Sequence, residues 1–175
     1  MEHRSALLIV DVISDFSFDD GEILFPRAKA IAGNIARLKR TFLDQEKLVI
    51  FVNDNQEGKI PDVDRLFQTA RTTSMGRSIL EKITPDPGLV LLKPQRSGFY
   101  ATDLEKRLRK AYITDVVVTG WTTDICVLFT AHDAFMRKFK VKVPSDCSNA
   151  LRPTHHSNAL RFLRRVAEAD VSPAF

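Results

Sequence analysis

The stretch ITDVVVTGWTTDICVLFTAHDAF, residues 113–135, decides the fold that the sequence predicts. The apolar run at residues 116–118 is typical of a strand buried on both faces, and residues 120–123 predict a turn. An apolar-periodic helix follows, with Cys126 in or near its first turn. Free backbone N–H groups and the helix dipole favour a thiolate there, as a nucleophile requires. Free cysteines are also among the most buried residues, so a place in the core is the alternative.

Composition places the chain among ordinary globular proteins. It has 175 residues, 44% hydrophobic and 27% charged, which predicts a single domain spanning residues 1–175. No apolar run approaches the roughly 20 residues of a membrane span. Asp11 interrupts the first apolar run, so no secretory signal is predicted and a cytoplasmic location is expected. Cys126 and Cys147 are not expected to form a disulfide, and their spacing predicts no zinc site.

The positive charge of the chain is mild, at +4, and is spread among acidic residues. Two denser basic groups occur at residues 138–142 and 161–165. The first alternates with apolar residues, as on the solvent face of a strand, and the second lies on one side of a predicted helix. No aromatic stacking pattern accompanies either group, so solvated faces are predicted and nucleic-acid binding is the weaker alternative.

Strands and helices alternate along the chain. Continuous apolar runs predict strands at residues 6–10, 48–52, 89–92, 116–118 and 141–143. Val171 is a candidate for a short last strand. This alternation predicts an α/β fold with a mainly parallel sheet and helices on both faces.

Helical spacing of apolar residues predicts a long helix at residues 26–45, with Pro26 in its first turn, and a final helix at about residues 154–168. Residues 53–87 are less regular and indicate short helices between loops. That segment is a candidate lid, an ordinary connection or a subunit contact.

Three reactive side chains follow three of the predicted strands. Asp11 and Lys93 come directly after apolar runs, and Cys126 follows the turn after a third. The carboxyl ends of parallel strands lie at one edge of a sheet, so the three are expected to share one crevice. Asp11 would take the thiol proton, and Lys93 would stabilise anionic intermediates. Taken singly, Asp11 and Lys93 could be solvated strand ends and Cys126 a core residue.

The surroundings of these residues carry a family resemblance. Asp11 lies in LLIVDVISDF, Lys93 in LLKPQRSGFYATDL and Cys126 in VVVTGWTTDICVLFTAHDAF. Together the stretches resemble the isochorismatase-like cysteine hydrolases, a superfamily that includes nicotinamidases and N-carbamoylsarcosine amidohydrolases. The resemblance extends from residue 6 to about residue 169, and its most specific part is the pattern Gly-x-x-Thr-x-x-Cys-Val at residues 120–127.

The resemblance implies a three-layer, Rossmann-like α/β fold with a six-stranded, mainly parallel sheet flanked by helices. It implies a catalytic triad with Asp11 as base, Lys93 as electrostatic partner and Cys126 as nucleophile. It also implies a non-proline cis peptide at Trp121–Thr122, with the backbone N–H groups of Thr122 and Cys126 forming an oxyanion hole.

The same resemblance suggests which residues surround the substrate. Phe16, Phe99 and Trp121 are candidate walls of the pocket, with plain core packing as the alternative. Metal-dependent nicotinamidases carry an Asp-x-His-x-His cluster after the second strand, whereas residues 54–58 here contain no histidine. A lone carboxylate is a poor site for zinc or iron, so no metal and no cofactor are expected. Asp54 is then a candidate substrate-binding residue or a simple loop cap.

The leading hypothesis is a cysteine hydrolase that cleaves a C–N bond of a small amide or ureido compound through a thioester at Cys126. One alternative is vinyl ether hydrolysis of the isochorismatase type, led by Asp11 with Cys126 as a bystander. The other is a non-catalytic binding protein with the same fold. A small-molecule partner is expected, with no nucleic acid and no membrane. The resemblance implies a homo-oligomer, either a dimer or a tetramer.

Overall fold

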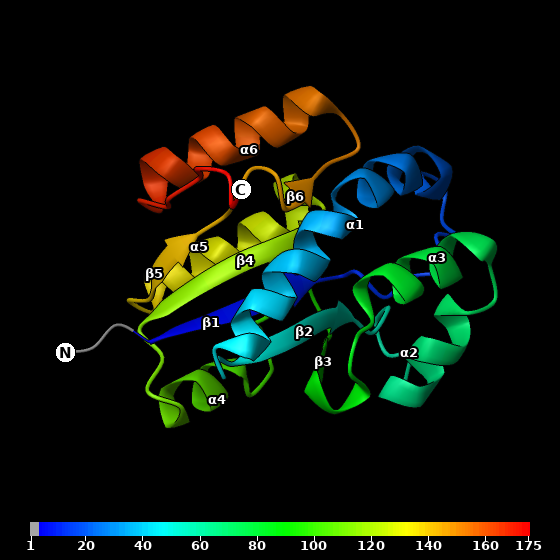
Figure 1. Cartoon of the computed structure of the whole chain (residues 1–175), viewed down its shortest axis with the longest axis horizontal. Coiled ribbons are helices and arrows are strands. Elements are labelled where there is room, and N and C mark those ends of the chain that lie inside the picture. Colours follow the sequence, from blue (N-terminus) through cyan, green and yellow to red (C-terminus); the bar gives the residue numbers. More distant parts are fainter. Residues whose placement is uncertain (1–3) are drawn as a thin grey trace.

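The computed structural model describes residues 4–175, so His3 lies outside the described part of the chain. A twisted sheet crosses the molecule, and helices flank it (Figure 1). The strands are β1 (Ser5–Val10), β2 (Val49–Asp54), β3 (Val90–Lys93), β4 (Asp115–Trp121), β5 (Lys140–Lys142) and β6 (Ser148–Asn149). The helices are α1 (Gly21–Asp44), α2 (Val63–Ala70), α3 (Ser74–Ile83), α4 (Leu104–Lys110), α5 (Leu128–Met136) and α6 (Pro153–Val166), with a 3-10 turn at Pro87–Leu89 and a π-helical turn at Thr123–Val127.

The strand order is β3-β2-β1-β4-β5, and β6 pairs with β4. Each of these described pairs is parallel. The six-stranded, parallel α/β architecture is therefore confirmed. Val10 at the end of β1 stands beside Val52 of β2 and Gly120 of β4, and Asp54 stands beside Lys93. The residues that follow these strand ends consequently meet at one edge of the sheet.

The two faces of the sheet belong to two separate apolar clusters. Along β1, Ala6, Leu8 and Val10 pack with buried residues of α4, α5 and α6. Leu7 and Ile9 point the other way and pack with buried residues of α1, α2 and α3. Both faces of the strand are thus covered, which explains why its sequence is continuously apolar. The result is a three-layer arrangement.

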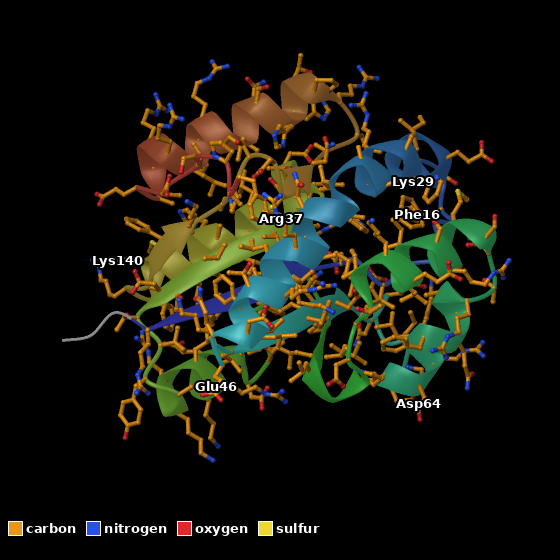
Figure 2. All side chains as sticks on the ribbon, in the orientation of Figure 1. Phe16, Lys29, Arg37, Glu46, Asp64 and Lys140 are labelled. Atoms are coloured by element: carbon orange, nitrogen blue, oxygen red, sulfur yellow. The ribbon has the colours of Figure 1, made fainter. Side chains whose placement is uncertain are left out.

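The outer surface of the helices carries charged side chains together with exposed apolar ones, such as Ile23, Phe129 and Phe162. Figure 2 shows the charged side chains of Lys29, Arg37 and Asp64 on the outer sides of α1 and α2, and all three are exposed. Within residues 4–175, no helix has the combined length and apolar character that crossing a membrane requires.

Two predicted elements differ from the structure. The first helix begins at Gly21 rather than at Pro26, which lies inside it. Pro26 has no N–H to pair with a carbonyl of the first turn, and the helix forms without that hydrogen bond. Leu24 lies on the same buried stripe as Ala28, so the helix extends upstream of Pro26. The sixth strand is β6, not a strand at Val171, because Asp170 forms only an isolated bridge to Lys142. A two-residue strand is too short for a periodic signal.

Gly120→Ala is expected to destabilise the fold by at least about 3 kcal/mol, because two effects add. Gly120 has φ +108°, and a Cβ there would lie 2.0 Å from the carbonyl oxygen of Val10. The matched control is Gly33→Ala in α1, where the nearest atom would be Lys82 Cε at 3.5 Å. This control should stabilise by roughly 0.5–1 kcal/mol. Urea unfolding measures both, and equal stability of the two variants would contradict the expectation.

Candidate active site

Asp11 lies immediately after β1 with its backbone in the left-handed region, at φ 55°. Its backbone N–H donates to Val52 O at 2.9 Å. Its Oδ1 accepts a hydrogen bond of 2.8 Å from the backbone N–H of Asp54, and its Oδ2 lies 3.1 Å from Lys93 Nζ. The carboxylate is thus held by residues of β2 and β3, which fixes its direction at the sheet edge. A non-glycine residue in this conformation is maintained only by such surroundings.

Lys93 is the last residue of β3 and is fully buried, with 0% of its side chain exposed. Its ammonium contacts Asp11 at 3.1 Å, Asp54 at 3.3 Å and Cys126 Sγ at 3.5 Å. Burial by itself lowers the pKa of Lys93, but Asp11, Cys126 and Asp54 outweigh it, so the pKa is raised above its ordinary value. The ammonium therefore stays charged at neutral pH.

Cys126 lies in the π-helical turn between β4 and α5 and is 7% exposed. Burial, followed by the neighbouring Asp11 carboxylate, raises the pKa of its thiol far above the ordinary value, and Lys93 opposes this only in part. The expectation that the helix start favours a thiolate is therefore wrong for the resting site. The thiol instead holds its proton in a hydrogen bond with Asp11. Burial also raises the pKa of Asp11 above its ordinary value, although Lys93 lowers it.

A protonated resting thiol should make Cys126 slow to alkylate. At pH 7 we expect iodoacetamide to label Cys126 in the folded protein at least about tenfold more slowly than in the unfolded chain. Each unit by which folding raises the pKa of the thiol lowers the thiolate fraction about tenfold. Peptide mass spectrometry follows both cysteines, and Cys147, with a pKa raised by burial to about 12, should be slow as well. Rapid labelling of Cys126 below pH 7 would contradict the raised pKa.

The turn that carries Cys126 begins with a cis peptide bond at Trp121–Thr122, as the resemblance implies. The Thr122 carbonyl accepts hydrogen bonds from the backbone N–H groups of Ile125 at 3.1 Å and Val127 at 3.2 Å. These contacts fold the turn around the Thr122 carbonyl. The oxyanion hole at the N–H groups of Thr122 and Cys126 stays a prediction.

Helix α6 supports this turn from behind, which sequence reasoning missed. Thr123 Oγ1 lies 2.8 Å from His156 Nδ1, and His155 Nδ1 lies 3.2 Å from Asp124 Oδ2. Burial lowers the pKa of His156, which favours a neutral ring at neutral pH. Neither histidine lines the cavity beside Cys126. The two histidines support the turn, and neither is in a position to act as a base for Cys126.

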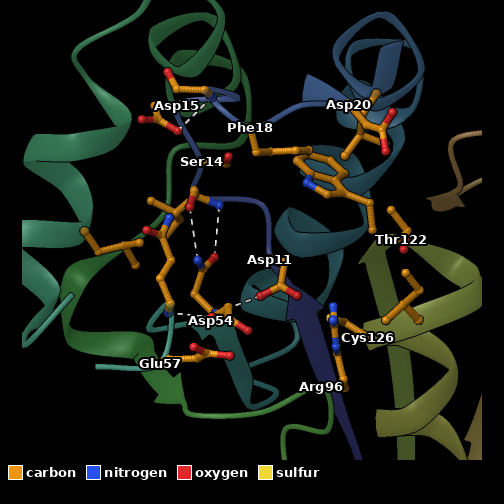
Figure 3. Close-up of a pocket in the computed structure, with 18 of the residues that line it drawn as sticks. Asp11, Ser14, Asp15, Phe18, Asp20, Asp54, Glu57, Arg96, Thr122 and Cys126 are labelled. Carbon is orange, nitrogen blue, oxygen red and sulfur yellow. Dashed lines mark hydrogen bonds between the residues drawn. The ribbon is translucent and has the colours of Figure 1, made fainter. Parts of the chain in front are cut away.

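A cavity of about 740 Å³ opens above the three reactive residues. Asp11 and Cys126 line it, together with Asp54, Trp121 and Thr122 (Figure 3). Lys93 lies beneath them, in contact with the first two. The structure thus brings together the predicted triad, Asp54, Trp121 and the oxyanion-hole position at Thr122.

Phe16 and Phe99, expected as walls, do not line this cavity. Phe16 is 1% exposed, and its ring packs beneath the wall against Phe25 and Trp121, with centroids 5.4 and 6.0 Å away. Phe99 is buried in the other apolar cluster, next to Phe139. Both therefore belong to the core, which was the alternative for each.

Other cavity residues escaped sequence reasoning. Phe18 takes the place expected for Phe16 and is 49% exposed. Asn53 shapes the loop after β1 by pairing with both the N–H and the C=O of Ile13, at 3.0 Å each. Arg96 lines the cavity from the loop after β3. Gln56, Glu57 and Lys59 also contribute, so the irregular segment forms part of the wall.

The residues present do not fit the metal site of the nicotinamidases with an Asp-x-His-x-His cluster. Asp54 has only Glu57 as a further acidic side chain in residues 54–58, and its carboxylate lies 3.3 Å from Lys93. Within residues 4–175, no group of three or more His, Cys, Asp or Glu side chains is arranged to hold a metal ion. Asp54 instead shares the ammonium of Lys93 with Asp11.

Comparison with known proteins agrees with this geometry. YaaI of Bacillus subtilis, an uncharacterized isochorismatase family protein, is 34% identical over 168 residues, which cover 95% of this chain and 92% of YaaI. The crystal structure of N-carbamoylsarcosine amidase from Thermoplasma acidophilum has a TM-score of 0.76 and 31% identity, covering 97% of this chain and 96% of the amidase. The nicotinamidase SaPncA of Staphylococcus aureus has a TM-score of 0.73 and 26% identity, covering 98% and 100%. The isochorismatase domain profile matches residues 5–172. The chain therefore belongs to the isochorismatase family of hydrolases.

Proposed function

We propose that the protein hydrolyses a C–N bond of a small amide or ureido compound through a thioester at Cys126. The observation that carries the proposal is the contact of one buried ammonium, Lys93, with both Asp11 and Cys126, at 3.1 and 3.5 Å. A base, a nucleophile and a fixed positive charge are thereby joined at the base of one cavity. Covalent hydrolysis uses the three as proton acceptor, nucleophile and stabiliser of negative charge.

In the first half of the reaction, Asp11 accepts the thiol proton as Cys126 Sγ attacks the carbonyl carbon of the substrate. The thiolate need not exist beforehand, which agrees with the raised pKa of the resting thiol. Lys93 and the backbone N–H groups of Thr122 and Cys126 stabilise the negative charge that develops on sulfur and oxygen. The C–N bond then breaks, and Asp11 returns the proton to the leaving nitrogen.

In the second half, water hydrolyses the thioester. Asp11, again ionised, accepts a proton from the water as its oxygen attacks the acyl carbon, and the sulfur leaves and recovers a proton. For an amide, the products are the free acid and ammonia or a small amine. For a ureido compound, the intermediate at sulfur is a thiocarbamate, and its hydrolysis gives a carbamic acid that breaks down to an amine and carbon dioxide. Asp11 alternates between proton acceptor and proton donor in these steps. Its carboxylate must therefore reach both the sulfur and the groups bound in the cavity.

The N-carbamoylsarcosine amidase in the comparison supports a ureido compound as substrate. The nicotinamidase supports a simple amide. The lack of histidine at residues 54–58 favours the former. We further propose that the protein acts as one domain spanning residues 1–175, as a homo-oligomer and in the cytoplasm.

The test is ammonia release by the purified protein from a panel of small amides and ureido compounds, with product identification by mass spectrometry. Nitrogen release identifies an amidohydrolase. Pyruvate-type products from isochorismate, without nitrogen release, would instead support vinyl ether hydrolysis led by Asp11. Absence of turnover across both classes would favour a binding protein.

A further inference from the structure

We propose that Arg96 binds a carboxylate of the substrate, so that the substrate is a small amide or ureido compound carrying a carboxylate group. This inference rests on the proposed function and adds a substrate class to it. It makes Arg96 a specificity-determining residue of the same site.

The first observation is position. Arg96 follows Lys93 by three residues, in the loop after β3, and lines the cavity that Asp11 and Cys126 also line. Its side chain is exposed rather than packed into the core. In Figure 3, Arg96 extends from the cavity wall toward the region of Asp11 and Cys126. A guanidinium placed there can reach a group on the same small molecule that the thiol attacks.

The second observation is the lack of an internal partner. Lys93 is already engaged by Asp11 and Asp54. No carboxylate within residues 4–175 forms an ion pair with Arg96, and no described aromatic ring stacks on it. Other arginines, such as Arg137, hold their acidic neighbours close. The Arg96 guanidinium is therefore available to a ligand.

The third observation is the charge on the opposite wall. Asp15 and Asp20 line the cavity with Phe18, away from Arg96 in Figure 3. A carboxylated substrate is repelled by those acids and attracted by the guanidinium, whose planar fork can donate two parallel hydrogen bonds to a carboxylate. Glu57 and Lys59, two residues apart and of opposite charge, also line the cavity. Repulsion by Asp15 and Asp20 and attraction by Arg96 favour an orientation with the carboxylate at Arg96 and the scissile carbonyl over Cys126. One contact with Arg96 thereby both selects a carboxylated substrate and orients it.

Iodoacetate and iodoacetamide provide a matched pair of probes, because they differ by a carboxylate and an amide. In each case Cys126 Sγ bonds to the methylene carbon, iodide leaves and the thiol proton goes to base. We measure the rate of each at Cys126 by peptide mass spectrometry over hours at pH 9. The ratio of the two rates cancels the slow ionisation of the thiol, and the unfolded chain gives the intrinsic ratio.

Arg96→Gln is expected to lower the iodoacetate-to-iodoacetamide ratio about tenfold, the effect of losing a charge-assisted hydrogen bond. Arg96→Lys should recover part of it. The matched control is Lys106→Gln, which removes the same charge from an exposed position on α4 outside the cavity. The ratio should stay within about twofold in this control. An unchanged ratio in Arg96→Gln, or an equal fall in Lys106→Gln, would overturn the proposal.

Hydrolysis separates this proposal from the function on which it rests. Paired substrates, N-carbamoylglycine and its methyl ester, differ in the same charge. Arg96→Gln should lose about tenfold in kcat/KM on the acid, mainly in KM, and little on the ester. If the wild type releases ammonia from neither, nor from the wider panel, while the alkylation ratio still depends on Arg96, the proposed function fails and the carboxylate site stands. If the wild type releases ammonia but the iodoacetate-to-iodoacetamide ratio does not depend on Arg96, the proposed function stands and the carboxylate site fails.

Discussion

Cys126→Ala is expected to lower amide hydrolysis by at least about 10⁴-fold, the order of loss when a covalent hydrolase loses its nucleophile. The methyl group of alanine cannot form a thioester. A water molecule in the place of the sulfur is a weaker nucleophile than the activated thiol. Folding should be little affected, because the resting thiol is uncharged and only a sulfur atom is removed from the turn. Ammonia release measures the activity, and thermal unfolding shows that the variant is folded.

The second cysteine supplies the control for this experiment. Cys147 is fully buried, carries a thiol whose pKa burial raises to about 12, and does not line the cavity. Cys147→Ala should therefore cost about 1 kcal/mol of stability and leave turnover within about twofold of the wild type. Turnover by Cys126→Ala equal to that of Cys147→Ala would exclude the thioester and move the reaction to Asp11 alone.

The meeting of Asp11, Lys93 and Cys126 could be predicted because a strong local signal controls it. Each follows a continuous apolar run, and such runs form parallel strands whose carboxyl ends share an edge. The registers of β1 with β2 and β4, and of β2 with β3, then bring the three residues together. The sheet places Asp11 and Lys93 at this edge, and the turn after β4 adds Cys126 to them.

What could not be predicted depends on direction and burial. Phe16 and Phe18 are indistinguishable as sequence, yet the left-handed backbone of Phe16, at φ 60°, accompanies a ring turned into the core, while Phe18 reaches the cavity. The helix start predicts a lowered pKa for Cys126, whereas the pKa is raised, for a related reason. The helix start is a local feature that favours the thiolate, but burial and Asp11 are tertiary and outweigh it. Residue type and spacing carry neither kind of information.

Asp11→Asn is expected to lower kcat/KM by about 10³-fold, within the range of a general base, because the amide cannot take the thiol proton. The pH profile should change as well. Burial raises the pKa of Asp11 above 3.8, so in the wild type activity falls as the pH decreases through that raised value and the base becomes protonated. The residual activity of Asp11→Asn should lack this acidic limb, which a pH series of kcat/KM would reveal.

Asp54→Asn is the matched control for Asp11, because both carboxylates contact the ammonium of Lys93, at 3.3 and 3.1 Å. Either variant removes one negative charge and leaves Lys93 with one carboxylate partner, so their stabilities should be similar. Of these two carboxylates, Asp11 is the one that hydrogen-bonds to the thiol of Cys126. Asp54→Asn should therefore lose no more than about tenfold and keep the acidic limb. Equal losses would mean that Asp11 serves to balance the charge of Lys93, and the proton would then need another acceptor in the cavity.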